Sequence, residues 1–179
     1  MTQIANNYAQ ALYSLAKEED LTQVILDELL VLDAGIAEEP AYLRLLSAPN
    51  LSKATRCEIL DNAFRGKVHP YILNFLKILT EKGYIRHFSD CCRAFREQYN
   101  EDNDILSVNA VSAVALTEDQ KIRLTDKLAA ITGKHISLTN RVDPQCLGGI
   151  RLDYNGKRVD GTVQNRLDTI QKQLKSTVL

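Results

Sequence analysis

The chain of 179 residues is 45% hydrophobic and 25% charged, which is typical of a soluble protein with a packed core rather than of a disordered one. Its formal net charge of −1 argues against a chain that is, as a whole, a basic nucleic-acid binder. No apolar run approaches the roughly 18 residues that a membrane-spanning helix needs, and the opening sequence MTQIANNYAQALYSLAKEED lacks the basic and apolar regions of a signal peptide.

The first part of the chain predicts six consecutive helices, because apolar residues recur at helical spacing in six segments. Pro40 and Pro70 suit first helical turns, Ser52 suits a cap, and Gly66 and Gly83 suit helix ends. The six apolar stripes cover residues 4–15, 24–36, 42–46, 59–63, 71–82 and 88–99, with Gly35 weakening the end of the second. Cys91 and Cys92 fall on the packed stripe of the sixth helix, so we expect them to be core residues.

The periodicity changes after residue 104. DILSVNAVSA and HISLTNRV alternate between apolar and polar residues, which is typical of strands. Between them, Thr117 and Gln120 fit a capping box that opens a helix, and Gly133 ends it. The apolar residues expected on one side of this helix are Leu124, Leu128 and Ile131. A last helix is expected to carry Val163, Leu167, Ile170 and Leu174 on one face.

These elements predict two domains, an all-α six-helix bundle over residues 1–103 and a small α/β module with a β-hairpin and a terminal helix over residues 104–179. Residues 1–103 carry 11 Lys/Arg and 15 Asp/Glu, a net charge of −4, whereas residues 104–179 carry 11 and 8, a net charge of +3. Such a split suggests two domains with different partners. A swing of this size also arises by chance.

The stretch LGGIRLDYNGKRVDGTVQNRL resembles a phosphate-binding loop only at first sight. Six residues, not four, separate Gly149 from Gly156, and Arg158 occupies the position of the hydroxyl that a P-loop needs. Asn155-Gly156 is instead a strong signal for a two-residue hairpin turn.

That turn pairs Leu152 with Val159 on one face and two oppositely charged pairs on the other. The charged pairs are Asp153 with Arg158 and Arg151 with Asp160. Asp160 and Thr162 then lie where a cap for the last helix belongs.

The sequence contains none of the common catalytic or metal-binding patterns. His69, His87 and His135 lie far apart in the sequence and outside any HExxH pattern. The four cysteines lack the paired spacing of a zinc site. We therefore expect no catalytic residue, no metal and no cofactor, although residues distant in sequence can still meet in a fold.

The first and fifth helices carry wider apolar arcs than a core-facing helix needs. Each arc covers roughly 160°, whereas a core stripe needs about 100°. One interpretation is that both helices lie at the centre of the bundle and are covered by their neighbours. The other is that they also form a groove for an amphipathic partner helix, in which case small residues such as Ala5, Ala9 and Ala11 allow close approach.

Four segments of the sequence resemble those of a known protein family. The segments YAQALYSLA, FLKILTEKG, VNAVSAVALTEDQ and VDPQCLGGIRLDYNGKRVDGTVQNRL are similar, in order and spacing, to the delta subunit of bacterial and chloroplast F-type ATP synthase, the counterpart of the mitochondrial oligomycin-sensitivity-conferring subunit. Two positions depart from the family pattern. Tyr84 follows Gly83 where the family often has arginine, and Thr162 replaces a common serine but keeps its capping hydroxyl.

The resemblance implies a non-catalytic stator subunit of the F1Fo complex. In that family the amino-terminal domain holds the amino-terminal helix of an α subunit in the groove of the first and fifth helices, and the carboxy-terminal domain meets the peripheral-stalk b subunits. Membrane association is then expected only through the complex, on the cytoplasmic side of a bacterial plasma membrane or the stromal side of a thylakoid. The anchors expected for the α helix are Tyr8, Leu12, Leu15, Ile72, Phe75, Leu76 and Leu79.

Two other classes of function remain as alternatives. A six-helix bundle with an accessory α/β module could bind RNA, but the net charge of −4 over residues 1–103 and the absence of a basic cluster interleaved with aromatic residues disfavour it. A nucleotide-handling enzyme rests only on the glycines that the hairpin explains.

Overall fold

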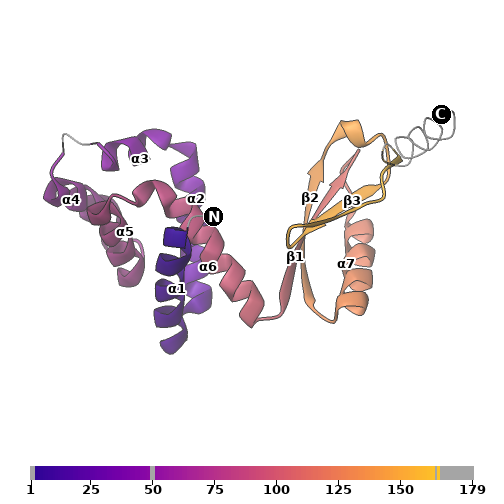
Figure 1. Ribbon diagram of the computed structural model, residues 1–179, viewed down its shortest axis with the longest axis horizontal. Coiled ribbons are helices and arrows are strands. Elements are labelled where there is room, and N and C mark those ends of the chain that lie inside the picture. Colours follow the sequence, from indigo (N-terminus) through magenta and orange to yellow (C-terminus); the bar gives the residue numbers. More distant parts are fainter. Residues whose placement is uncertain (1–2, 49–50, 164, 166–179) are drawn as a thin grey trace, which may run out of the picture. The chain divides into compact units, whose positions relative to one another are not determined.

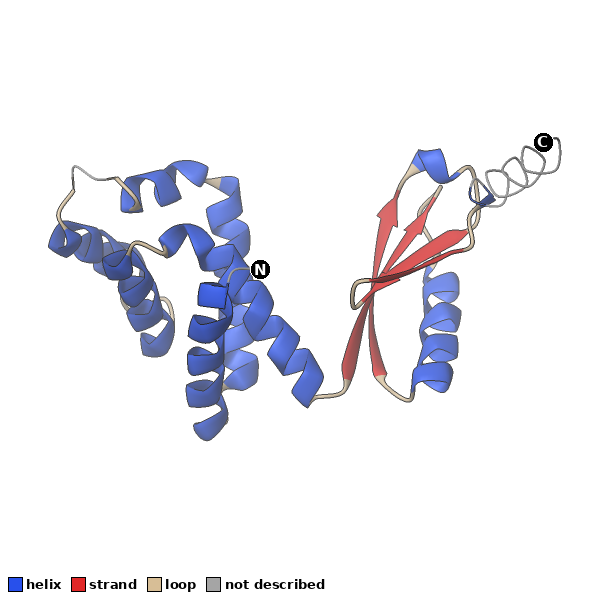
Figure 2. Cartoon of the chain, in the orientation of Figure 1, coloured by secondary structure: helices blue, strands red, loops and turns tan. Residues whose placement is uncertain are grey.

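The computed structural model describes residues 3–48, 51–163 and 165. Its contacts divide the chain into two compact units, Met1–Tyr99 and Asn100–Leu179. Figure 1 labels the elements, and Figure 2 shows that the strands among the described residues all belong to the second unit. The chain is thus helix-rich with one small sheet.

The first unit is built from helices with one shared core. The elements in chain order are α1 (Gln3–Glu18), α2 (Thr22–Glu38), α3 (Pro40–Leu46), α4 (Lys53–Phe64), α5 (Pro70–Lys82), the 3-10 helix η1 (Ile85–His87) and α6 (Phe88–Asp102). Every one of them contributes buried apolar side chains to a single cluster, including Cys91 and Cys92 as expected. The two adjacent cysteines and the apolar stripes of these helices are therefore accounted for by packing in this core.

Local signals set most helix ends in this unit. The Ser52 hydroxyl accepts a hydrogen bond from the Thr55 backbone N–H at 3.1 Å at the start of α4. Gly83 has a left-handed backbone at the end of α5, as its lack of a Cβ allows. Helix α2 continues three residues past Gly35, to Glu38. A glycine costs only about 1 kcal/mol in a helix, and the burial of Ile36 outweighs it.

In its described residues, the second unit is a four-stranded sheet with one α-helix against it. Its elements are β1 (Ile105–Ser112), α7 (Glu118–Thr132), β2 (His135–Val142), the 3-10 helix η2 (Pro144–Cys146), β3 (Ile150–Tyr154) and β4 (Lys157–Asp160). The strand order is β2-β1-β3-β4, with β1 and β2 parallel and the other neighbours antiparallel. Figure 1 shows α7 along one face of this sheet, and α7 packs against β2.

The buried face of β1 is the one that alternation predicts. Leu106, Val108 and Ala110 are buried. The register places Leu152 of β3 beside Ala110 and Val159 of β4 beside Leu152, where Val159 is 52% exposed. The predicted capping box is also present, because Thr117 and Gln120 exchange hydrogen bonds between side chain and backbone.

The predicted packed face of α7 needs a correction. Leu124 and Leu128 are half-buried, but Ile131 is 81% exposed. It lies in the last turn of α7, and it is only about 20° around the helix from the half-buried Leu124, so helical periodicity alone does not reveal its exposure. The last helix, expected to carry Leu167, Ile170 and Leu174, lies outside the described residues apart from its start.

Candidate partner-binding site

Helix α1 presents apolar side chains on two faces. Leu12 and Tyr13 are buried together with three small residues on the inner face, Ala5, Ala9 and Ala16. The other face carries a strip at i, i+4, i+7 and i+11, which is one helical seam. Its residues are Ile4, Tyr8, Ala11 and Leu15. Tyr8 is half-buried and the other three are exposed, so α1 keeps an apolar seam that its own domain does not cover.

Most of the apolar residues of helix α5 are buried in the core. The His69 ring accepts a hydrogen bond from the Tyr71 backbone N–H at 3.3 Å, and Glu28 of α2 accepts one from the His69 backbone N–H at 2.7 Å. These bonds satisfy the first turn of α5. The helix buries Ile72, Leu73, Phe75, Leu76, Leu79 and Thr80. Only Ile78 among its large apolar residues is exposed in the described chain.

An aromatic contact joins the exposed seam of α1 to the end of α5. The Tyr8 ring lies 6.0 Å from the ring of Tyr84, centroid to centroid, in a tilted arrangement. Tyr84 follows Gly83 directly, and its own ring lies 6.5 Å from that of His87. Both tyrosines are half-buried against the core. The residue that departs from the family pattern therefore contributes to the surface beside the α1 seam.

The structure separates the seven expected anchors into two groups. Leu12, Ile72, Phe75, Leu76 and Leu79 are buried in the core. Tyr8 and Leu15, which is 38% exposed, are accessible to a partner. Ile4 and Ala11 are not among the anchors expected from the sequence, although both belong to the wide apolar arc of α1. Contact between these residues and a partner remains a prediction.

The hairpin has the predicted turn and register. Asn155 and Gly156 both have positive φ, +45° and +71°, as a two-residue turn of this kind requires. All four expected pairs are present, from Tyr154 with Lys157 to Arg151 with Asp160. The stretch is therefore a structural hairpin.

The charged pairs on the hairpin are only partly as predicted. Arg158 Nε lies 2.7 Å from Oδ1 of Asp153, and this hydrogen bond lowers the pKa of the Asp153 carboxyl. Arg151 was expected to pair with Asp160. Instead Arg151 Nε lies 3.4 Å from Oδ2 of Asp153 on its own strand, because the Asp160 carboxylate is turned toward Thr162.

Asp160 and Thr162 form the predicted cap. Asp160 Oδ1 accepts hydrogen bonds from the Thr162 hydroxyl at 2.6 Å and from the Thr162 backbone N–H at 3.0 Å, and these lower the Asp160 pKa. The Thr162 hydroxyl in turn accepts from the Asn165 backbone N–H at 3.2 Å. Thr162 is buried, so this hydroxyl serves the backbone and not a ligand.

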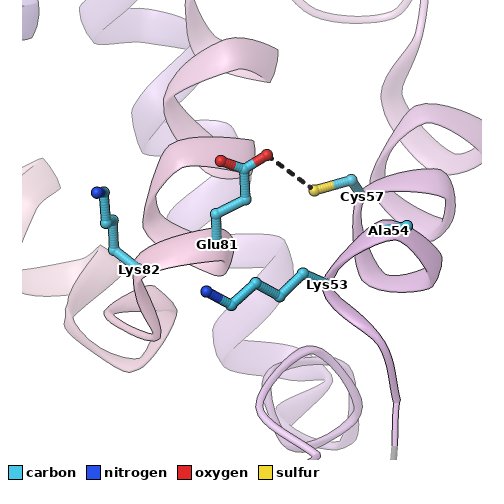
Figure 3. A pocket seen from close by; sticks show the side chains of 5 residues that line it. All are labelled: Lys53, Ala54, Cys57, Glu81 and Lys82. Atoms are coloured by element: carbon cyan, nitrogen blue, oxygen red, sulfur yellow. Dashed lines mark hydrogen bonds between the residues drawn. The ribbon is translucent and has the colours of Figure 1, made fainter.

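A small open pocket lies between α4 and α5 (Figure 3). It is lined by Lys53, Ala54, Cys57, Glu81 and Lys82 and has a volume of about 340 Å³. The Cys57 thiol points at Glu81, with 3.8 Å between Sγ and Oε1. Burial and this carboxylate raise the pKa of Cys57. A thiol that stays protonated is a poor nucleophile, so the pocket lacks the chemistry of a cysteine active site.

The described ranges, 3–48, 51–163 and 165, contain neither a candidate metal site nor a candidate membrane span. Their His, Cys, Asp and Glu side chains nowhere form a group of three that could hold a metal ion. None of their helices has both the length and the apolar character that crossing a bilayer requires.

Comparison with known proteins gives a consistent result. The family model described as "ATP synthase delta (OSCP) subunit" matches residues 4–174. The chain is 32% identical over 171 residues to ATP synthase subunit delta of Alkaliphilus oremlandii, covering 96% of this chain and 95% of that protein. It is 36% identical over 173 residues to the subunit delta of Lactobacillus gasseri, covering 96% and 94%.

A solved structure shares the fold. A chain in the cryo-EM structure of the Toxoplasma gondii mitochondrial ATP synthase hexamer superimposes with a TM-score of 0.78, at 18% sequence identity, over 97% of this chain and 98% of that one. At this identity the likeness concerns the fold alone.

Proposed function

The chain belongs to the ATP synthase delta (OSCP) subunit family, and from this premise we propose that it is a non-catalytic stator subunit of the proton-translocating F1Fo complex. It links the F1 head to the b subunits of Fo and resists rotor torque during ATP synthesis. Domain 1–103, acting as one six-helix bundle, binds the amino-terminal helix of an α subunit. Domain 104–179 binds the peripheral-stalk b subunits.

The exposed seam of α1 is the observation that carries the proposed head contact. An isolated apolar side chain on a surface needs no explanation, but a seam at helical spacing does. Ile4, Ala11 and Leu15 are exposed along one side of α1, and Tyr8 connects this seam to Tyr84. An amphipathic helix that lies along α1 buries such a seam with its own apolar face.

The expected anchors that are buried contribute to the proposed contact indirectly, by holding the helices in position. Leu12, Phe75 and Leu76 are buried, so in this proposal they hold α1 and α5 in place while the outer seam makes the contact. A joint that bears torque should bind tightly, and nanomolar affinity corresponds to about −12 kcal/mol. A few buried aromatic and aliphatic anchors reach that value.

The proposed contact with the b subunits rests on charge. Residues 104–179 carry a net charge of +3, which favours an acidic or mixed-charge partner. Binding of the b subunits should therefore weaken as salt is added, because exposed charges are screened. An interaction that does not respond to salt would show that this charge is incidental.

The proposed location follows from the same assembly. The subunit is peripheral to the membrane and associates with it through the complex, on the F1 side. That side is the cytoplasmic face of a bacterial plasma membrane or the stromal face of a thylakoid membrane.

Titration of a labelled α-subunit amino-terminal peptide into the full chain tests the head contact. We expect submicromolar binding that is weakened at least tenfold by Leu15→Asp, because that substitution places a charge in the apolar seam. Val114→Asp is the matched control, since Val114 is an exposed valine of the second unit. Binding no tighter than millimolar, or equal losses from the two variants, would overturn the proposal.

A further inference from the structure

Helix α2 is unusually apolar on its solvent side. Its exposed residues are Gln23, Val24, Asp27, Leu30, Val31, Ala34, Gly35, Ala37 and Glu38, and six of these nine have no polar side chain. The inner face of α2 packs in the core, where Ile25, Leu29 and Ile36 are buried. A helix that is apolar on nearly all sides is normally buried, so the outer face of α2 has the character of a covered surface.

The exposed apolar residues of α2 include one continuous seam. Val24, Val31 and Gly35 lie within an arc of about 40° around the helix, at i, i+7 and i+11. Val24 is 45% exposed and Val31 is 72% exposed. A Cβ added at Gly35 would meet nothing within 4 Å, so a second helix could approach the seam closely at this end.

Carboxylates border this seam on both sides. Helical geometry places Asp27 and Glu38 along one side and Glu28 along the other. Glu28 Oε2 accepts a hydrogen bond from the His69 backbone N–H at 2.7 Å, which fixes the carboxylate beside the seam. An apolar seam flanked by charges of one sign is the pattern by which helices select partners of opposite charge.

The charged side chains in the sequence around this seam are all negative. Residues 18–43 contain eight carboxylates and no Lys, Arg or His. This field disfavours nucleic acid and anionic lipid surfaces. It also disfavours a symmetric contact with a second copy, because a two-fold interface would place the same carboxylates opposite each other.

We propose that the Val24–Val31–Gly35 seam is a docking site for a basic amphipathic helix of another polypeptide, with Lys or Arg on both sides of its apolar face. The partner's apolar residues pack on the two valines, and its cations meet Asp27, Glu28 and Glu38. The site lies on α2 and not on the seam of α1, so it does not depend on the proposed head contact.

Two synthetic helical peptides of about 18 residues, or about 27 Å, test the site on the full chain. Both carry the same leucine seam; one has lysines flanking it and the other glutamates. We expect the lysine peptide to bind at least tenfold more tightly, with an affinity that falls as NaCl rises from 50 to 300 mM. Val31→Ser should weaken it at least fivefold. Val114→Ser is the control, because Val114 is 73% exposed and Val31 72%.

Three results would overturn the proposal. The first is equal binding of the two peptides, and the second is equal loss of binding in Val31→Ser and Val114→Ser. The third is a dimer of the chain alone, seen by analytical ultracentrifugation, that dissociates in Val31→Ser, because the seam would then be a contact between copies. Failure of the α-subunit peptide to bind the chain would leave these outcomes unchanged, so the two proposals are tested separately.

Discussion

Arg158 Nε lies 2.7 Å from Oδ1 of Asp153, its cross-strand partner in the hairpin of β3 and β4. The hydrogen bond and the charge of Arg158 hold the pKa of Asp153 below its usual range. A carboxyl whose pKa is lower in the folded state stabilises that state above its unfolded pKa of about 3.9. This stabilisation is lost as the pH falls through the folded pKa.

Asp153→Asn should therefore destabilise the hairpin at pH 7 and not at pH 2. We expect a loss of about 0.2–1 kcal/mol, the usual range for a cross-strand pair, since both side chains are partly exposed. Native-state hydrogen exchange of the β3 and β4 amides measures the local free energy. Lys157→Gln, beside the turn, is the control and should change little. An Asp153→Asn effect of the same size at both pH values would contradict the ion pair.

The backbone contact between Gly149 and Gly161 gives a second prediction. Gly149 has φ of +80°, and a Cβ added there would lie 2.6 Å from the Gly161 carbonyl oxygen. Gly149→Ala should cost roughly 2–4 kcal/mol, from left-handed backbone strain and overpacking together. Gly156→Ala provides a matched control, because φ is +71° but nothing lies within 4 Å. It should cost about 1 kcal/mol.

Urea unfolding followed in the second unit compares the two glycine variants. Equal losses would show that the loop moves away from Gly161 without cost, and that the close approach is not needed for the fold. A larger loss in Gly149→Ala would explain why a glycine stands at position 149, directly before β3.

The hairpin also shows how far the sequence alone could go. Asn155-Gly156 determines the turn, and the turn determines the register of all four pairs, so local chemistry was enough. The partner of Arg151 depends instead on which groups compete for the Asp160 carboxylate. Asp160 is occupied by the hydroxyl and backbone N–H of Thr162, and no cross-strand rule contains that information.

The candidate partner surfaces were harder to predict for a physical reason. Apolar residues surround much of α1, so periodicity could not decide whether Leu12 or Leu15 faces inward. The structure buries Leu12 and exposes Leu15, because the contacts of the other helices determine the side. On α2, the sequence pattern places Val24 in the ordinary stripe of the second helix, because it lies beside Ile25, which does reach the core, whereas Val24 itself is exposed.

Leu12 and Leu15 give a third prediction, because they are one turn apart on α1 but differ in burial. Leu12→Ala should lower the free energy of unfolding by about 2–5 kcal/mol, as expected for a buried leucine. Leu15→Ala should change it by no more than about 0.5 kcal/mol. In the titration with the α-subunit peptide, however, Leu15→Ala should weaken binding at least fivefold. Normal affinity in Leu15→Ala would remove the outer seam of α1 from the proposed contact.

Three cysteines of the first unit give a fourth prediction, because the same thiol group occurs there in two environments. Cys57 is half-buried, whereas Cys91 and Cys92 are buried. Burial raises the pKa of Cys91 to about 11 and also raises that of Cys92. A disulfide reagent attacks through the thiolate, so at pH 8 it should label Cys57 in the native chain, while Cys91 and Cys92 should react only when the first unit opens.

Glu81 controls the rate at Cys57 in this prediction. Its charge and hydrogen bond raise the Cys57 pKa, after the larger effect of burial. Glu81→Gln should lower that pKa and speed labelling at pH 8 by about twofold to tenfold, because more of the thiol is ionised. Glu58→Gln is the control, since Glu58 is the exposed neighbour of Cys57 on α4. If both variants accelerate labelling equally, general surface charge and not the 3.8 Å contact between Cys57 Sγ and Glu81 Oε1 determines the reactivity of Cys57.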